Sequence, residues 1–116
     1  MKSTDRFFPT LFLIAAALLL LAVAMPGADK PDGTALYKQK CSMCHAPDGK
    51  GYSAIGTPDF TSAKWQASKT DKEIAETIKN GKTGTAMQGF GDARKQDEIR
   101  ALVERIRSFN SEKKNR

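Results

Sequence analysis

The chain has 116 residues, of which 19 are Lys or Arg and 13 are Asp or Glu, and its formal net charge is +6. A chain of this length forms one domain at most. The basic residues do not alternate with aromatic residues, so we expect no nucleic-acid partner. The basic excess is compatible with ordinary solubility, or with steering toward an acidic protein or an anionic membrane face.

Residues 1–24 are predicted to be a signal peptide or a membrane anchor. Lys2 and Arg6 give a basic start, and an almost unbroken apolar run covers residues 7–25. Ala22-Val23-Ala24 is typical of a cleavage site. The run has 19 residues (25 − 7 + 1), close to the length that spans a bilayer of about 30 Å, so an uncleaved anchor helix is the alternative. Both interpretations place the rest of the chain in the periplasm, either free or associated with the membrane through residues 7–25.

A linker is expected over residues 25–31, followed by a folded domain over residues 32–110. Asp32 can cap a short helix that runs to Lys40 and into Cys41. The apolar positions of this helix are Ala35, Leu36 and Tyr37.

The segment Cys41-Ser42-Met43-Cys44-His45 has the spacing of a c-type haem attachment site. Two thiols can add to the haem vinyl groups as thioethers, and the adjacent histidine can bind the iron as an axial ligand. The chain has no other cysteine and no other histidine. A redox dithiol, half of a zinc site and a chance occurrence of the pattern are the alternatives. A dithiol motif of the thioredoxin kind should follow a strand, and no β-branched run precedes Cys41; zinc would need carboxylates to complete four ligands.

A loop is expected from Ala46 to Ala67, because this segment contains two prolines and three glycines and shows no sustained period. A loop of this length needs a buried core to pack against, and a bound haem is a candidate for that core. Thr70 and Glu73 then form a capping box that starts a helix ending at Asn80-Gly81. The predicted buried side of that helix consists of Ile74, Ala75 and Ile78.

A second glycine-rich loop, from Gly81 to Gly91, precedes the last predicted helix, which covers residues 96–109. Asp92 is the best candidate for the N-cap of this helix, and residues 111–116 are expected to form a flexible, frayed tail. No repeat and no strand pattern is present, so the predicted fold class is all-α. The apolar positions of the last helix follow the i, i+3, i+4, i+7 pattern: Ile99, Leu102, Val103, Ile106 and Phe109.

Met87 is the candidate for the second axial ligand of the iron. Methionine is the usual partner of histidine in electron-transfer cytochromes, and it raises the reduction potential. Met43 lies inside the cysteine motif and Met25 near the cleavage region, whereas Met87 lies 42 residues beyond His45 (87 − 45) in a loop that can reach the opposite haem face. A methionine that merely fills a gap in the core is the alternative.

These segments together resemble the class I c-type cytochromes, especially the small mono-haem domains similar to the cytochrome c subunits of haem–copper oxidases. The resemblance covers Asp32 to Phe109 and runs through DGTALYKQKCSMCHAPDGKG, GTPDF, the single Trp, EIAETIKNGKTGTAMQGFG and EIRALVERIRSF. It implies a cytochrome c-like fold of three to four short helices wrapped around one covalently bound haem c, preceded by the apolar signal or anchor helix. It also implies a carrier of single electrons that is not an enzyme and has no small-molecule substrate.

The resemblance assigns roles to several further residues. The carbonyl of Pro58 would accept a hydrogen bond from the second ring nitrogen of His45, unless Pro58 is an ordinary turn proline. Gly33 and Tyr37 would lie where the first helix crosses the last, with Tyr37 packed on Leu102 or Ile106. Trp65 would line the haem edge near a propionate, or else be a surface-anchoring aromatic.

Two departures from the family pattern bear on function. Gln88 follows Met87 where the family commonly has proline, which keeps open an alternative in which the sixth position is labile and the protein is a ligand-binding haem sensor. Arg105 stands where the last helix commonly has an aromatic residue. Redox-partner proteins are expected to dock transiently over the exposed haem edge, guided by basic residues such as Lys50 and Lys82.

Overall fold

The computed structural model describes residues 29–92 and 95–116, and these residues are mostly helical, as predicted. They form five α-helices rather than three to four, together with one short 3₁₀-helix, and within these ranges the only β-type pairing is an isolated bridge between Gly81 and Gln88. The predicted signal or anchor, residues 1–24, lies outside the described residues. No helix within the described ranges is both long and apolar enough to cross a membrane. The α-helices are α2 (Gly33–Lys40), α3 (Ser42–His45), α4 (Ala63–Ser68), α5 (Asp71–Asn80) and α6 (Gln96–Lys114), and the 3₁₀-helix η1 covers Ser53–Ile55.

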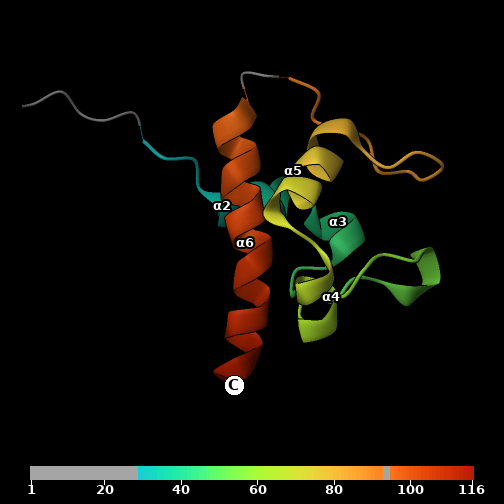
Figure 1. The fold of residues 1–116 in the computed structure, drawn as a ribbon, viewed down its shortest axis with the longest axis vertical. Coiled ribbons are helices and arrows are strands. Elements are labelled where there is room, and N and C mark those ends of the chain that lie inside the picture. Colours follow the sequence, from blue (N-terminus) through green and yellow to red (C-terminus); the bar gives the residue numbers. More distant parts are fainter. Residues whose placement is uncertain (1–28, 93–94) are drawn as a thin grey trace, which may run out of the picture.

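The long helix α6 is the centre of the packing, and α2, α4 and α5 all contact it (Figure 1). Every apolar position predicted for its inner face is buried, which confirms the helical period read from the sequence. Leu102 is completely buried, and Phe109 is 2% exposed. The buried residues of α6 are Ile99, Ala101, Leu102, Val103, Ile106 and Phe109.

The crossing of α2 and α6 depends on a glycine and an aromatic residue. A Cβ atom on Gly33 would lie 2.2 Å from the carbonyl oxygen of Ala101, so only glycine allows this approach. One turn later, the ring of Tyr37 packs edge-on against Phe109, with 5.0 Å between ring centroids. Tyr37 belongs to the same buried cluster as Leu102. The expected crossing is therefore confirmed.

Two helix starts follow the predicted capping chemistry. The Asp32 carboxylate accepts hydrogen bonds from the backbone N–H groups of Thr34 and Ala35, at 2.9 and 3.2 Å. At the start of α5, Thr70 and Glu73 form the complete capping box. These side chains satisfy N–H groups that have no partner inside their helices.

Three boundaries differ from expectation. The predicted Ala46–Ala67 loop contains α4, whose first turn is capped by Ser62 through a 3.3 Å bond from the Trp65 N–H. The N-cap of α6 is Lys95 rather than Asp92, with no side-chain cap bond. The predicted frayed tail is helical as far as Lys114, and its last turn carries basic residues, which suit the negative end of the helix dipole.

Candidate haem-binding site

The cysteine–histidine motif folds as a single helical turn. The carbonyl of Cys41 accepts hydrogen bonds from the N–H groups of Cys44 and His45, at 3.1 and 2.9 Å. Cys44 and His45 are three and four positions after Cys41, so both thiols and the imidazole belong to one helical turn. The two thiols are free, with Cys44 exposed and Cys41 half-buried.

The environment of Cys41 argues against the dithiol alternative. Burial raises the pKa of its thiol from the ordinary value of 9.0 to about 11. Cysteines that exchange disulfides need a thiolate and therefore have a lowered pKa. The raised pKa of Cys41, which packs against the hydrophobic core, instead favours the protonated thiol at neutral pH.

The backbone that leaves the motif is held by four hydrogen bonds to two consecutive carbonyls. The Tyr37 hydroxyl shares its proton between the carbonyls of His45 and Ala46, at 3.1 and 2.9 Å. The Gly51 N–H also donates to the His45 carbonyl at 3.0 Å, and the Gly49 N–H donates to the Ala46 carbonyl at 3.2 Å. Ala46 has φ 62° and ψ 150°, a conformation that residues other than glycine rarely adopt. The turn after His45 is therefore fixed by its surroundings rather than by local preference.

The His45 imidazole stacks on the ring of Phe60, with centroids 4.9 Å apart and an interplanar angle of 18°. Burial lowers the pKa of His45 from its ordinary value of 6.5, which favours the neutral ring that binds metals. Among the described residues its buried Nδ1 has no hydrogen-bond partner, so the bond expected to the Pro58 carbonyl is not formed in this structure.

The Pro58 carbonyl nevertheless lies beside the loop that leaves the motif, because a Cβ atom on Gly51 would be 2.6 Å from it. Pro58 itself is half-buried.

The donor set of the motif fits a haem c: two free thiols and one neutral imidazole with an unpaired buried nitrogen.

Met87 is half-buried and packs against the same core cluster as Cys41. Its backbone is held on both sides, because its carbonyl accepts from the Lys82 N–H at 3.1 Å and its N–H donates to the Thr85 hydroxyl at 3.2 Å. Gln88, which replaces the common proline, pairs with Gly81 in the isolated bridge. The loop is therefore well defined despite this departure.

Close backbone approaches attach the loop of residues 81–91, which carries Met87 and is called the methionine loop below, to the end of α5. A Cβ atom on Gly81 would lie 2.6 Å from the Met87 carbonyl oxygen, and one on Gly89 would lie 2.4 Å from that of Lys79. The Phe90 N–H also donates to the Ile78 carbonyl at 2.9 Å. Gly81 and Gly89 therefore allow both ends of this loop to pack closely against the end of α5.

Phe60 connects the predicted site residues, and sequence reasoning assigned it no role. The centroid of its ring lies 4.7 Å from that of the Trp65 ring. The same ring stacks on the His45 imidazole. Trp65 is half-buried and packs on the core, as Met87 does. The only sequence signal for Phe60 is its place two residues after Pro58, and the buried Gln66 of α4 had none.

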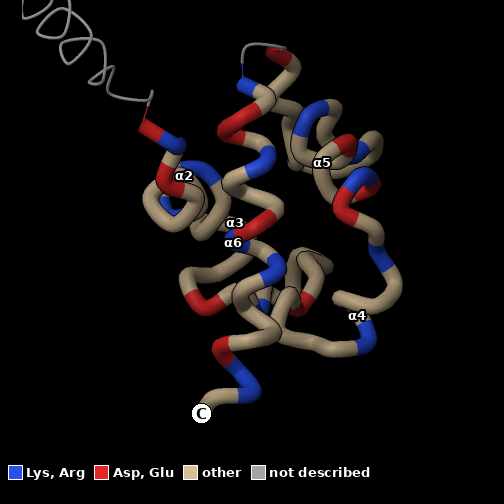
Figure 2. The backbone as a smooth tube through the Cα atoms, turned by 60° about the vertical axis from the view of Figure 1, so that its left-hand side comes forward, with Lys and Arg blue, Asp and Glu red and all other residues tan. Residues whose placement is uncertain are grey.

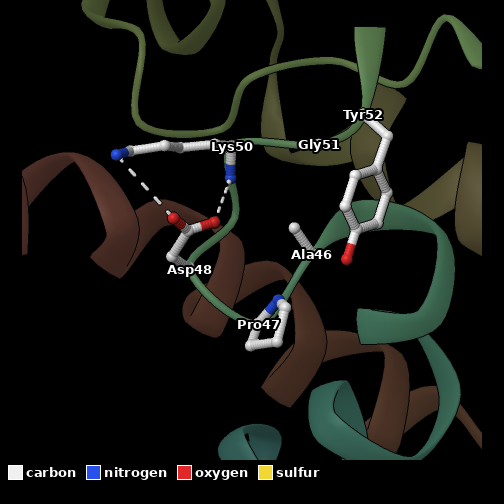
Figure 3. A pocket seen from close by; sticks show the side chains of 6 residues that line it. All are labelled: Ala46, Pro47, Asp48, Lys50, Gly51 and Tyr52. Carbon is white, nitrogen blue, oxygen red and sulfur yellow. Dashed lines mark hydrogen bonds and ion pairs between the residues drawn. The ribbon is translucent and has the colours of Figure 1, made fainter. Parts of the chain in front are cut away.

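A separate pocket of about 440 Å³ lies along the loop after the motif (Figure 3). Neither cysteine of the motif lines it, nor do His45 and Met87. In this loop the Lys50 ammonium lies 3.8 Å from the Asp48 carboxylate. The pocket residues are Ala46, Pro47, Asp48, Lys50, Gly51 and Tyr52.

Outside this loop, basic and acidic positions are interspersed along α5 and α6 rather than segregated (Figure 2).

Comparison with known proteins supports a cytochrome. The family model described as cytochrome c oxidase, cbb3-type, subunit III matches residues 28–104. The chain is 32% identical over 86 residues to the cbb3-type cytochrome c oxidase subunit FixP of Azorhizobium caulinodans, covering 72% of this chain and 29% of that protein. It is 24% identical over 115 residues to subunit CcoP of Rhodobacter capsulatus, covering 91% of this chain and 39% of that protein.

A solved structure, the KustC0563 c-type cytochrome, superimposes with a TM-score of 0.62 and 35% identity, covering 68% of this chain and 98% of that one. The chain spans well under half the length of the curated oxidase subunits that it matches. The match to the family model covers more than half of the chain and includes the cysteine–histidine turn and the methionine loop. The chain therefore belongs to the family of c-type cytochrome domains similar to subunit III of cbb3-type cytochrome c oxidases.

Proposed function

We propose that this chain is an exported mono-haem cytochrome c domain that passes single electrons between redox proteins. One haem c would be attached through Cys41 and Cys44, with His45 and Met87 as the axial ligands. The observation that carries the proposal is the helical turn of the motif, which contains two free thiols and a half-buried imidazole whose buried Nδ1 has no hydrogen-bond partner among the described residues. The bound haem supplies an iron that alternates between the ferrous and ferric states.

The residues of the chain would hold this group and exclude water from it. His45 is kept neutral by burial, the form in which an imidazole nitrogen donates to a metal. We assign the Pro58 carbonyl as the acceptor for its Nδ1 in the haem-bound protein, because an acceptor there raises ligand basicity. Trp65, which packs on Phe60, would cover part of the haem edge.

Met87 is proposed as the sixth ligand on the basis of its loop. The two backbone hydrogen bonds and the glycine contacts hold the loop against α5 without the usual proline. A thioether carried on a fixed backbone can stay bound to iron through both oxidation states. This backbone support favours Met87 as a bound ligand over the alternative of a labile sixth position, as in a haem sensor.

Membership of the oxidase-subunit family supports redox proteins as partners and a periplasmic location, with the apolar N-terminal segment as signal or anchor. Lys82 is exposed within the methionine loop and is the better candidate guide for a partner. Lys50 is exposed as well, but its ammonium group lies 3.8 Å from the Asp48 carboxylate, which offsets part of its charge. We propose no bond-making or bond-breaking reaction on a substrate.

Optical spectra of the protein produced in cells that attach haem would test the ligand assignment. We expect low-spin spectra with a methionine–iron charge-transfer band in the ferric form and no reaction of the ferrous form with carbon monoxide. Met87→Leu should abolish that band and allow carbon monoxide to bind. Met43→Leu is the matched control, since Met43 is 88% exposed, and it should leave both spectra unchanged. Rapid carbon monoxide binding by the unmodified protein would refute the Met87 assignment.

A further inference from the structure

Gln66 in α4 is a buried polar side chain, 9% exposed, whose amide is almost fully hydrogen-bonded. Its Nε2 donates to the carbonyls of Phe60 and Ile106, at 2.7 and 2.9 Å, and its Oε1 accepts from Arg107 Nη1 at 2.8 Å. Two carbonyls on one end of the amide and a guanidinium on the other define which end is nitrogen. Neither a carboxylate nor an apolar side chain can reproduce this set of bonds.

Arg107 in α6 holds Gln66 in place. Its Nη1 also donates to the backbone carbonyl of Gln66 at 2.7 Å, and its Nη2 donates to the Lys69 carbonyl. Its Nε donates to the Asp71 carboxylate at 2.7 Å. We name these two side chains the Gln66–Arg107 brace. The brace connects α4, the start of α5 and the middle of α6 through groups more than 35 positions apart in sequence.

Gln66 of the brace donates a hydrogen bond to the carbonyl of Phe60, whose ring stacks against the proposed iron ligand His45. Phe60 is 5% exposed, and both of its backbone polar groups are held: its N–H donates to the Gly49 carbonyl at 2.7 Å, and its carbonyl accepts from Gln66. Its ring lies nearly parallel to the His45 imidazole, at 18°. Because the Phe60 ring is packed on one ring face of His45, a shift of the Phe60 backbone changes the space in which the imidazole can rotate.

We propose that Gln66, locked by Arg107, is a positioning residue that sets the orientation of the His45 imidazole through Phe60. This inference rests on the proposed function, in which His45 binds the haem iron. Groups that orient a metal ligand without touching the metal adjust its bonding and the potential of the site. If Gln66 served only to join α4 to α6, its loss would lower stability and leave the imidazole orientation unchanged.

The test uses the haem-bound protein and a spectroscopic measurement of ligand orientation. The g values of ferric low-spin haem and the hyperfine-shifted resonances of its methyl groups respond to rotation of the axial imidazole. We expect Gln66→Met to shift both, together with the reduction potential, and Arg107→Lys to shift them in the same direction by less. Asp32→Ala is the control, because it removes the α2 cap; it should lower the unfolding temperature without shifting the spectra.

A double substitution tests whether Phe60 carries the effect. Phe60→Leu removes the stacked ring, so adding Gln66→Met to Phe60→Leu should produce no further spectral shift. Two independent, additive shifts would overturn the inference. If Gln66→Met does not yield folded protein, Arg107→Lys carries the test, and g values identical to those of the unmodified protein would overturn the inference while leaving the proposed function intact. An unmodified protein without attached haem would overturn the proposed function and this inference together.

Discussion

Replacement of Tyr37 by phenylalanine should destabilise the protein by about 1 kcal/mol, and the structure explains why the loss is not larger. The Tyr37 hydroxyl is bonded to the carbonyls of His45 and Ala46, and the residue is 2% exposed. Each carbonyl also accepts a second bond, from the N–H of Gly51 or of Gly49, at 3.0 and 3.2 Å. Neither carbonyl is left unpaired, so the loss is that of an ordinary hydrogen bond, about 0.5–1.5 kcal/mol, rather than about 1–3 kcal/mol for each orphaned group.

Urea unfolding of the haem-bound protein, followed by circular dichroism, would measure this change. Tyr52→Phe is the matched control, because Tyr52 is 45% exposed and its hydroxyl should contribute almost nothing. For a domain of this size, about 1 kcal/mol corresponds to a fall of about 4–8 °C in melting temperature. A loss of more than about 3 kcal/mol for Tyr37→Phe would refute the reasoning, because it would mean that the two carbonyls depend on the hydroxyl alone.

Three further substitutions test the packing and the α5 cap. Gly33→Ala should destabilise by about 1–3 kcal/mol because its Cβ would meet the Ala101 carbonyl oxygen at 2.2 Å; an unchanged urea midpoint would show that α2 can move away from α6. Leu102→Ala, at a completely buried position, should cost about 2–5 kcal/mol in the same assay, and a cost near zero would contradict the packing. Hydrogen bonds from the N–H and hydroxyl of Thr70 lower the pKa of Glu73 below its ordinary 4.5 in the folded protein. The ionised cap therefore stabilises fully above that value, and its contribution is lost as the pH falls through the lower folded pKa. Glu73→Gln should lower the melting temperature at neutral pH, and the difference should shrink in acid; a pH-independent difference would contradict this origin.

The features predicted correctly from the sequence depend on neighbouring residues. The caps at Asp32 and Thr70 are local rules that a few residues satisfy, and both are present. The inner face of α6 was predictable because the apolar period persists from Ile99 to Phe109, about three turns. The cysteine–histidine motif folds as a single turn of five consecutive residues, so its two thiols and its imidazole can be recognised from the local sequence alone.

The features that were missed depend on contacts between distant residues. α4 has six residues, too few to show a period. The burial of Gln66 depends on Arg107, 41 positions away, and the importance of Phe60 depends on a ring contact with His45 that its local sequence does not encode. The extension of α6 to Lys114 was missed because a polar sequence is as compatible with an exposed helix as with a frayed tail.

Attachment of haem is the central claim, and the intact mass of the protein purified from cells that attach haem tests it most directly. We predict the mass of the chain, with or without the signal segment, plus one haem that stays bound after denaturation, and no reaction with thiol reagents. Replacement of both Cys41 and Cys44 by alanine should remove the added mass. A colourless protein with the mass of the polypeptide alone and two titratable thiols would contradict the account.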